Sequence, residues 1–157
     1  MLIDLPTAKA HIRDDAAPDD QVQLYLRAAE QSAEQWLNRR IYATPEELTA
    51  ALLTVPAASL AAVTAYDAAL VAADALGDVR LVLDARAQAG RVYDRAADAI
   101  REIRDGIVIN DLIKAGILLL FGHLYASRED VVIGVTASEL PQGSKHLWQP
   151  YRRGLGV

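Results

Sequence analysis

Residues 110–125 read NDLIKAGILLLFGHLY, and this stretch decides the fold. Asn110 or Asp111 can cap a helix here, because both side chains accept hydrogen bonds from free backbone N–H groups. Apolar residues then cover most sides of the helix, and such a helix is normally buried on most sides. We therefore predict the central helix of a small, mainly α bundle. We expect no stretch of the chain to cross a membrane, which needs roughly 18 apolar residues, because the best candidate, 115–124, is far too short.

Two helices are predicted ahead of this stretch. Asp4 can cap a short helix that has Pro6 in its first turn and runs to about Arg13. Pro18 opens a longer helix that ends near Asn38. Apolar residues recur along it at steps of three and four, the spacing of a buried helical stripe: Val22, Tyr25, Leu26, Ala29, Ala33, Trp36 and Leu37.

The middle of the chain, about 44–104, is predicted as an alanine-rich helical region. A Thr-Pro-Glu-Glu capping box starts it, and the first helix is expected to stop before Pro56. Further helices are predicted at about 57–76 and 91–104, because alanine has the highest helix propensity. The intervening piece, 79–89, alternates apolar and polar residues at its start, so helix and strand both remain open there.

The composition describes a globular chain without reactive sulfur. Its 157 residues fit one domain, and 52% of them are hydrophobic, which suffices for a core. The chain contains 0 cysteines, which excludes disulfides, zinc–thiolate sites and thiol nucleophiles. The N-terminus lacks the pattern of a secretory signal, and we expect a cytosolic protein. A net charge of −5 disfavours a general nucleic-acid-binding protein.

The charge is unevenly distributed along the chain. From Gln142 onward the segment carries +3 with His146 neutral, so the preceding residues carry −8. Chain ends are usually disordered unless something holds them. We therefore interpret the last seven residues as a docking peptide: Tyr151, Arg152, Arg153, Gly154, Leu155, Gly156 and Val157.

The sequence contains no arrangement typical of catalysis, a cofactor or a metal. The histidines His11, His123 and His146 do not have the spacing of metal ligands. Acidic residues between 94 and 105 alternate with arginines, which is typical of an exposed, salt-bridged helix face. We predict no catalytic residue, no cofactor and no metal. A DNA-binding module and a ligand-binding bundle remain alternatives, and the second requires a polar pocket.

β-Branched residues after the central helix predict a short extended or β-hairpin arm near 131–138. Arg128 precedes this arm at the end of the helix. Two interpretations of Arg128 remain open. It can pair with the negative end of its own helix, or it can form an ion pair between subunits.

Several segments together resemble the head–tail connector family of tailed bacteriophages, also called head completion or adaptor proteins. The resemblance covers about 1–42 and 106–157, whereas the alanine-rich region is an elaboration on the simplest members. The residues that carry it are Leu5–Arg13, the acidic joint at 14–20, Trp36–Arg39, Ala115–Tyr125, Arg128–Glu129, Glu139–Gly143 and Pro150–Arg152.

The resemblance implies a structural protein without enzymatic activity. Such proteins form a ring, typically of twelve copies, beneath the portal vertex of the capsid. The ring extends the channel, through which DNA passes without sequence-specific binding, and offers a platform to a stopper or tail-completion protein. The implied location is the virion neck, after assembly in the bacterial host cytoplasm and without contact to a membrane.

The resemblance also divides the chain into a connector domain, 1–150, and a docking tail, 151–157, that binds the portal protein. It places the loop after the central helix at a subunit or platform interface. The residues expected there are Arg128, Glu129, Asp130, Glu139, Leu140 and Pro141. The alternative within the neck is the stopper that follows the adaptor.

Overall fold

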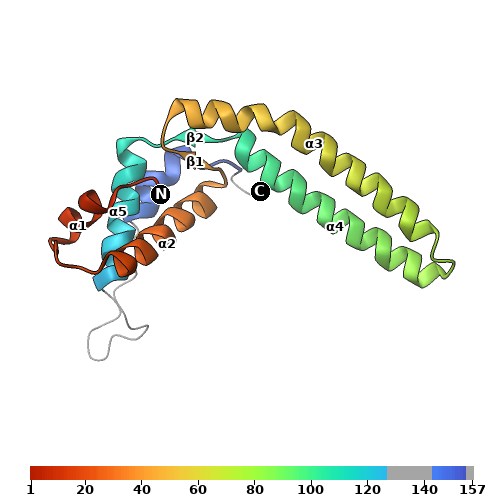
Figure 1. Cartoon of the computed structure of the whole chain (residues 1–157), viewed down its shortest axis with the longest axis horizontal. Helices are drawn as coiled ribbons and strands as arrows, with labels where there is room; N and C mark the ends of the chain where they lie inside the picture. The colour runs from red at the N-terminus through yellow and green to blue at the C-terminus, as the bar shows by residue number, and fades with distance from the viewer. Residues whose placement is uncertain (127–142, 155–157) are drawn as a thin grey trace. The chain divides into compact units, whose positions relative to one another are not determined.

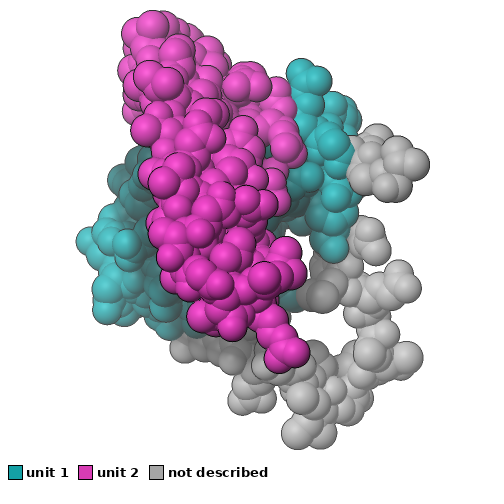
Figure 2. All heavy atoms as spheres, turned by 90° about the vertical axis from the view of Figure 1, so that its right-hand side faces the viewer, with its two compact units in different colours: residues 1–44, 107–157 teal, residues 45–106 magenta. Residues whose placement is uncertain are grey.

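The computed structural model describes residues 1–126 and 143–154. The described residues are mainly helical, which confirms the predicted fold class. They fall into two compact units, coloured teal and magenta in Figure 2. Unit 1 comprises Met1–Thr44 and Ile107–Val157, and unit 2 comprises Pro45–Gly106. The predicted arm near 131–138 lies outside the described residues.

Unit 1 is a helical bundle around α5 (Asp111–Ala126), the central helix expected from the sequence. Helix α5 packs against α1, α2 and α6 (Figure 1). Asn110 caps it, accepting a 2.9 Å hydrogen bond from the backbone N–H of Ile113 through its side-chain oxygen. The other elements of unit 1 are α1 (Leu5–Ile12), α2 (Asp19–Leu37), β1 (Ile41–Tyr42), β2 (Ile107–Val108), α6 (Gly143–Trp148) and the 3-10 turn η1 (Gln149–Tyr151).

Local signals define the ends of α1 and α2. The Asp4 carboxylate accepts a 2.8 Å hydrogen bond from the backbone N–H of Thr7, and this bond lowers the pKa of Asp4. Arg13 (φ 56°) and Asn38 (φ 53°) adopt the left-handed conformation that ends a helix. Pro18 is the N-cap of α2, one position before the first helical residue.

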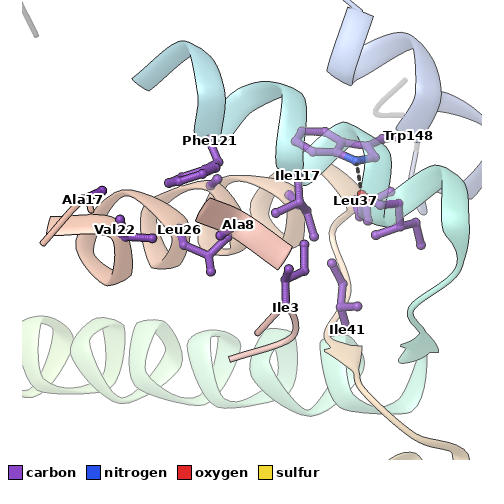
Figure 3. Packing of buried hydrophobic residues seen from close by; sticks show 13 residues of the cluster. Ile3, Ala8, Ala17, Val22, Leu26, Leu37, Ile41, Ile117, Phe121 and Trp148 are labelled. Atoms are coloured by element: carbon purple, nitrogen blue, oxygen red, sulfur yellow. Dashed lines mark hydrogen bonds between the residues drawn. The ribbon is translucent and has the colours of Figure 1, made fainter. Parts of the chain in front are cut away.

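The core of unit 1 lies on two sides of α5. Figure 3 shows Ile117 and Phe121 of α5 beside Leu26 of α2 and Ala8 of α1. The Trp148 indole packs on the other side of α5, and its Nε1 donates a 3.3 Å hydrogen bond to the carbonyl of Ile113. Because full burial of a large apolar side chain stabilises by about 1.5–3 kcal/mol, these contacts dominate the stability of unit 1.

The first residues of the chain are hydrogen-bonded to Glu30, whose carboxylate is buried on α2. Its Oε1 accepts hydrogen bonds from the backbone N–H groups of Leu2 (2.6 Å) and Ile3 (3.1 Å). Glu30→Ala leaves both donors without their acceptor, so we expect a loss of about 1–3 kcal/mol in urea unfolding. Glu30→Gln keeps an acceptor oxygen and is expected to lose less. Equal stability of all three proteins would contradict this role.

A two-residue parallel ladder joins parts of unit 1 that are distant in sequence. Ile41 pairs with Ile107 and Tyr42 pairs with Val108. The backbone N–H of Ile107 donates to the carbonyl of Arg40 over 2.9 Å. Burial raises the pKa of Tyr42 above its ordinary value of 10.0. The chain therefore leaves unit 1 just after β1 and returns to it at β2.

Unit 2 is an antiparallel pair of long helices, here called the α3–α4 hairpin. It consists of α3 (Pro45–Asp74) and α4 (Val79–Arg104), which lie side by side in Figure 1. The rings of Tyr66 and Tyr93 pack with their centroids 5.1 Å apart. Near the turn, Arg86 donates two hydrogen bonds of 2.8 and 2.9 Å to the carboxylate of Asp74.

The predicted break after 76 is confirmed, because α3 ends at Asp74 and α4 begins at Val79. The predicted breaks before Pro56 and at Gly90 are wrong. Helix α3 continues through Pro56. Proline has no backbone N–H, so the carbonyl of Leu52 loses its usual helical hydrogen bond. Pro56 and Leu52 (38%) are both exposed, so this carbonyl can bind water instead. Residues 79–89 belong to α4, which continues through Gly90. The Asp78 carboxylate caps it with a 2.8 Å hydrogen bond from the backbone N–H of Arg80, and this cap outweighs the short alternation.

Helix α3 also corrects the expectation about membrane spans. Of the described residues, Pro45–Asp74 form the single helix long and apolar enough to cross a membrane by length and composition, and 6% of its most apolar window is buried. Residues 115–124 are therefore not the best candidate. This length was not expected, because helices were predicted on both sides of Pro56 but not as one continuous helix, and Thr, Ser and Pro interrupt the apolar runs without adding charge.

Unit 1 is expected to fold without the α3–α4 hairpin. The buried core cluster takes all its residues from unit 1, and β1 lies beside β2 at the usual strand spacing of about 4.8 Å. A protein in which a short Gly/Ser linker replaces 45–106 should still unfold cooperatively in urea, as monitored by tryptophan fluorescence. Trp36 and Trp148 both lie in unit 1, so this signal reports on the remaining protein. A gradual, non-cooperative loss of the signal would contradict the expectation.

Candidate functional site

The described part of the predicted docking tail is attached to the end of α2. The backbone N–H of Arg153 donates a 2.9 Å hydrogen bond to the carbonyl of Leu37. The Asn38 amide donates to the carbonyl of Arg153 over 3.2 Å, and the Arg39 guanidinium donates to the carbonyl of Tyr151 over 3.1 Å. These three bonds hold the segment on the surface of unit 1.

Two cations share the ring of Trp36. The Arg152 guanidinium lies 4.6 Å from the ring centroid, and the Lys145 ammonium lies 4.9 Å from it. Such contacts contribute about 0.5–1 kcal/mol each near a surface. We call Trp36, Lys145 and Arg152 the tryptophan cluster. Arg152 is half-buried within it, whereas Arg153 is exposed.

Two donors in the tryptophan cluster lack an acceptor. The Trp36 Nε1 and the Arg152 Nε are buried, and neither has a hydrogen-bond partner within 1–126 and 143–154. A buried donor without an acceptor costs about 1–3 kcal/mol. A carboxylate or carbonyl group from another molecule, if the side chains shifted to admit it, would remove this cost.

The structure describes only some of the predicted site residues. Tyr151 ends η1, and Gly154 has a left-handed backbone (φ 61°) near the side chain of Asn38. Leu155, Gly156 and Val157 lie outside the described residues. The predicted subunit or platform interface also lies outside them: Arg128, Glu129, Asp130, Glu139, Leu140 and Pro141.

Trp36 was not expected as a site residue. It packs against the core, as its place in the apolar stripe of α2 predicted, and its ring also faces two cations of the C-terminal region. No local pattern reveals this contact, because the partners are far apart in sequence. The available signal was the unusual positive charge of the segment after Gln142.

Other polar features of unit 1 are small. In a hollow beside α1, Lys9 pairs with Asp19 over 2.7 Å and donates to the carbonyl of Asp15 over 3.3 Å. Because Asp19 is exposed, this is a surface ion pair of low energy. Over the described ranges, no group of three or more His, Cys, Asp or Glu side chains is placed to hold a metal.

Chemically, the tryptophan cluster and the attached segment present positive charge at one place on unit 1, and two donors buried there lack an acceptor within the described ranges. That combination fits an acidic or carbonyl-rich protein surface. A scan of protein-family models, a search of curated proteins and a search of solved structures each found no match to the chain.

Proposed function

We propose that the protein is a head–tail adaptor of a tailed bacteriophage, which forms a ring beneath the portal. One observation carries this proposal. The two segments that resemble the connector family, 1–42 and 106–157, fall almost entirely within unit 1, where their described residues share one core. The elaboration between them forms a separate unit. The division by resemblance therefore coincides with the division of the fold.

The attached C-terminal segment suits binding to the portal protein. Its backbone is fixed to Leu37 and Asn38, so its charges are oriented before the partner arrives. A segment that is already ordered loses less conformational entropy on binding. Arg153 is exposed and can therefore contact acidic groups of the portal. Exposed charges at the edge of an interface mainly set the rate and specificity of association.

The acidic body suits a channel for DNA. The residues before Gln142 carry −8, and negative charge repels the phosphate backbone. DNA can then pass without sequence-specific binding. In this proposal the ring, of about twelve copies, offers its other side to a stopper or tail-completion protein. The stopper itself remains the alternative, together with a non-viral ligand- or DNA-binding module.

The test is co-sedimentation with portal-bearing capsids from the same source. We expect stoichiometric binding of the full chain. We also expect its loss after truncation behind Pro150, which removes the contacts to Leu37, Asn38 and Arg39. A second truncation after Gly154 keeps these contacts and removes only the last three residues, so it shows whether those three residues contribute to binding. If the full chain does not bind, the adaptor proposal fails.

A point variant distinguishes charge from chain length in the same assay. Arg153→Glu keeps the backbone hydrogen bonds and reverses an exposed charge, so binding should weaken and lose its salt dependence. The matched control is Arg27→Glu on α2, which reverses an exposed charge elsewhere in unit 1. Equal weakening by both variants would indicate a general charge effect rather than a docking segment.

A further inference from the structure

One side of the α3–α4 hairpin contains an open groove with small side chains. Its volume is about 430 Å³, and its lining is almost wholly apolar. Alanines form most of its walls, so the groove has room for larger side chains from another surface. We call it the alanine groove; its walls include Ala65, Ala69 and Ala72 of α3 and Ala85, Ala89 and Val92 of α4.

A row of large apolar side chains occupies a different side of α3. Leu53, Leu60 and Val71 are 77%, 69% and 73% exposed. Their spacing places them in one line, because each helical residue advances by about 100°. By the same rule Ala69, in the groove, lies about 180° from Leu60. We call this row the α3 ridge. Three exposed apolar side chains in one line make this side of α3 a candidate contact surface.

We infer that the α3 ridge of one copy packs into the alanine groove of the next copy. The large side chains of the ridge match the small side chains of the groove. Because ridge and groove are different surfaces of the same hairpin, the contact is head-to-tail and each copy can bind two neighbours. That repeated contacts of this kind close into a ring is the part of the inference that rests on the proposed function.

The length of α3 sets an upper limit to the area of the joint. Thirty residues form a helix about 45 Å long and about 10 Å wide, so half of its lateral surface is about 700 Å². Each partner in a specific protein interface contributes about 800 Å². The groove itself covers only 62–73 of α3, about 18 Å, so contacts outside the groove supply the rest of a stable interface.

Charge complementarity favours a second copy as the occupant. Helix α3 carries 4 carboxylates and no lysine or arginine, whereas α4 carries 6 arginines and 4 carboxylates. One carboxylate of α3, Asp74, already pairs with Arg86 inside the hairpin, so Asp67 is the carboxylate that favours a neighbouring copy. Asp67 is exposed and stands in the line of the ridge. In a lipid interior that carboxylate would be unfavourable, whereas at a protein joint it can pair with an arginine of the neighbouring α4. A membrane is therefore the disfavoured occupant.

Mixing two variants of the full chain tests the joint. Leu60→Asp damages the ridge and keeps the groove, while Ala72→Trp fills the groove and keeps the ridge; both positions are exposed. We expect concentration-dependent association of the unmodified chain in analytical ultracentrifugation. Each variant alone should associate at least about tenfold more weakly. Their mixture should form dimers and nothing larger, because one intact ridge meets one intact groove.

The control is Leu24→Asp on α2, which changes a leucine that is 60% exposed in unit 1. It should associate like the unmodified chain. The inference is overturned if the unmodified chain stays monomeric, if the mixture does not dimerise, or if Leu24→Asp has the same effect as Leu60→Asp.

Cysteine cross-linking shows which surfaces meet, because the chain has 0 cysteines of its own. Leu60→Cys is mixed with a cysteine variant of one groove residue, Ala65→Cys, Ala72→Cys or Gln88→Cys, and a short bis-maleimide is added. We expect a cross-linked dimer in at least one mixture and little product from Leu60→Cys alone. Efficient cross-linking of Leu60→Cys with itself would indicate a two-fold contact and overturn the head-to-tail joint.

Two further readouts separate this inference from the proposed function. If capsid binding persists and the joint fails, only the joint is overturned; the reverse result overturns only the adaptor role. Flotation with phosphatidylcholine vesicles tests the membrane alternative. Binding of the full chain that Leu60→Asp abolishes would assign the ridge to lipid and overturn the inference.

Discussion

Gly116→Ala is expected to destabilise unit 1 strongly. A Cβ at this position of α5 would lie 2.7 Å from Cε2 and 2.9 Å from Cδ1 of Trp148. The indole is 2% exposed and hydrogen-bonded to Ile113, so it cannot move aside without losing that bond. Overpacking of this kind costs about 1–3 kcal/mol or more, which outweighs the gain of about 1 kcal/mol from alanine's helix propensity.

Urea unfolding followed by tryptophan fluorescence measures this loss. The matched control is Gly90→Ala in α4, where a Cβ meets nothing within 4 Å. There the propensity gain of about 0.5–1 kcal/mol should appear alone, as a higher melting temperature in far-UV circular dichroism. The two substitutions are chemically identical, so effects of the same sign would contradict the steric explanation.

Trp148→Ala is expected to have the largest effect of any single substitution. Removing a buried tryptophan side chain costs about 3–5 kcal/mol, because both its apolar contacts and its packing volume are lost. Here the carbonyl of Ile113 also loses its donor. The same variant should weaken capsid binding, since Trp148 anchors α6 just before the attached C-terminal segment.

A double-mutant cycle ties the two predictions together. Gly116→Ala should cost much less in the Trp148→Ala background, because the added methyl group then enters vacated space. Trp148→Phe serves as the control, since it keeps an aromatic ring but removes the indole N–H. Additive losses would show that the contact between Gly116 and Trp148 does not limit the packing.

Features that depend on neighbouring residues were predictable from the sequence. Asp4 caps α1, Asn38 ends α2 and Asn110 caps α5, each through contacts within a few residues. The central position of α5 was also predictable from its many apolar residues, although Leu112 (45% exposed) and Leu119 (49% exposed) show that one side of the helix is not buried within the described residues. These parts of the sequence analysis are confirmed.

Features that depend on distant contacts were not predictable. Pro56 and Gly90 are local helix breakers, but packing of α3 against α4 keeps both helices continuous. The pairing of Ile41 with Ile107 has too short a pattern to be recognised. Trp36 was predicted only as part of the apolar stripe of α2. Its contact with Arg152 could not be predicted, because Arg152 lies at the other end of the chain.

For the candidate site, the positive charge after Gln142 indicated the right region. The anchoring of Arg153 on Leu37 is a long-range backbone contact, and the sequence contains no sign of it. The interface expected at Arg128–Asp130 and Glu139–Pro141, and the arm between them, lie outside the described residues and stay predictions.

The insertion of the α3–α4 hairpin between β1 and β2 has a consequence for the order of folding. Unit 1 is assembled from two segments, and closing the long loop between them is entropically unfavourable in an unfolded chain. The hairpin, by contrast, consists of local antiparallel contacts, which form quickly. Once α3 and α4 have paired, the end of β1 and the start of β2 are already near each other. We therefore expect early pairing of α3 with α4 to speed the assembly of unit 1, although unit 1 does not require it to fold.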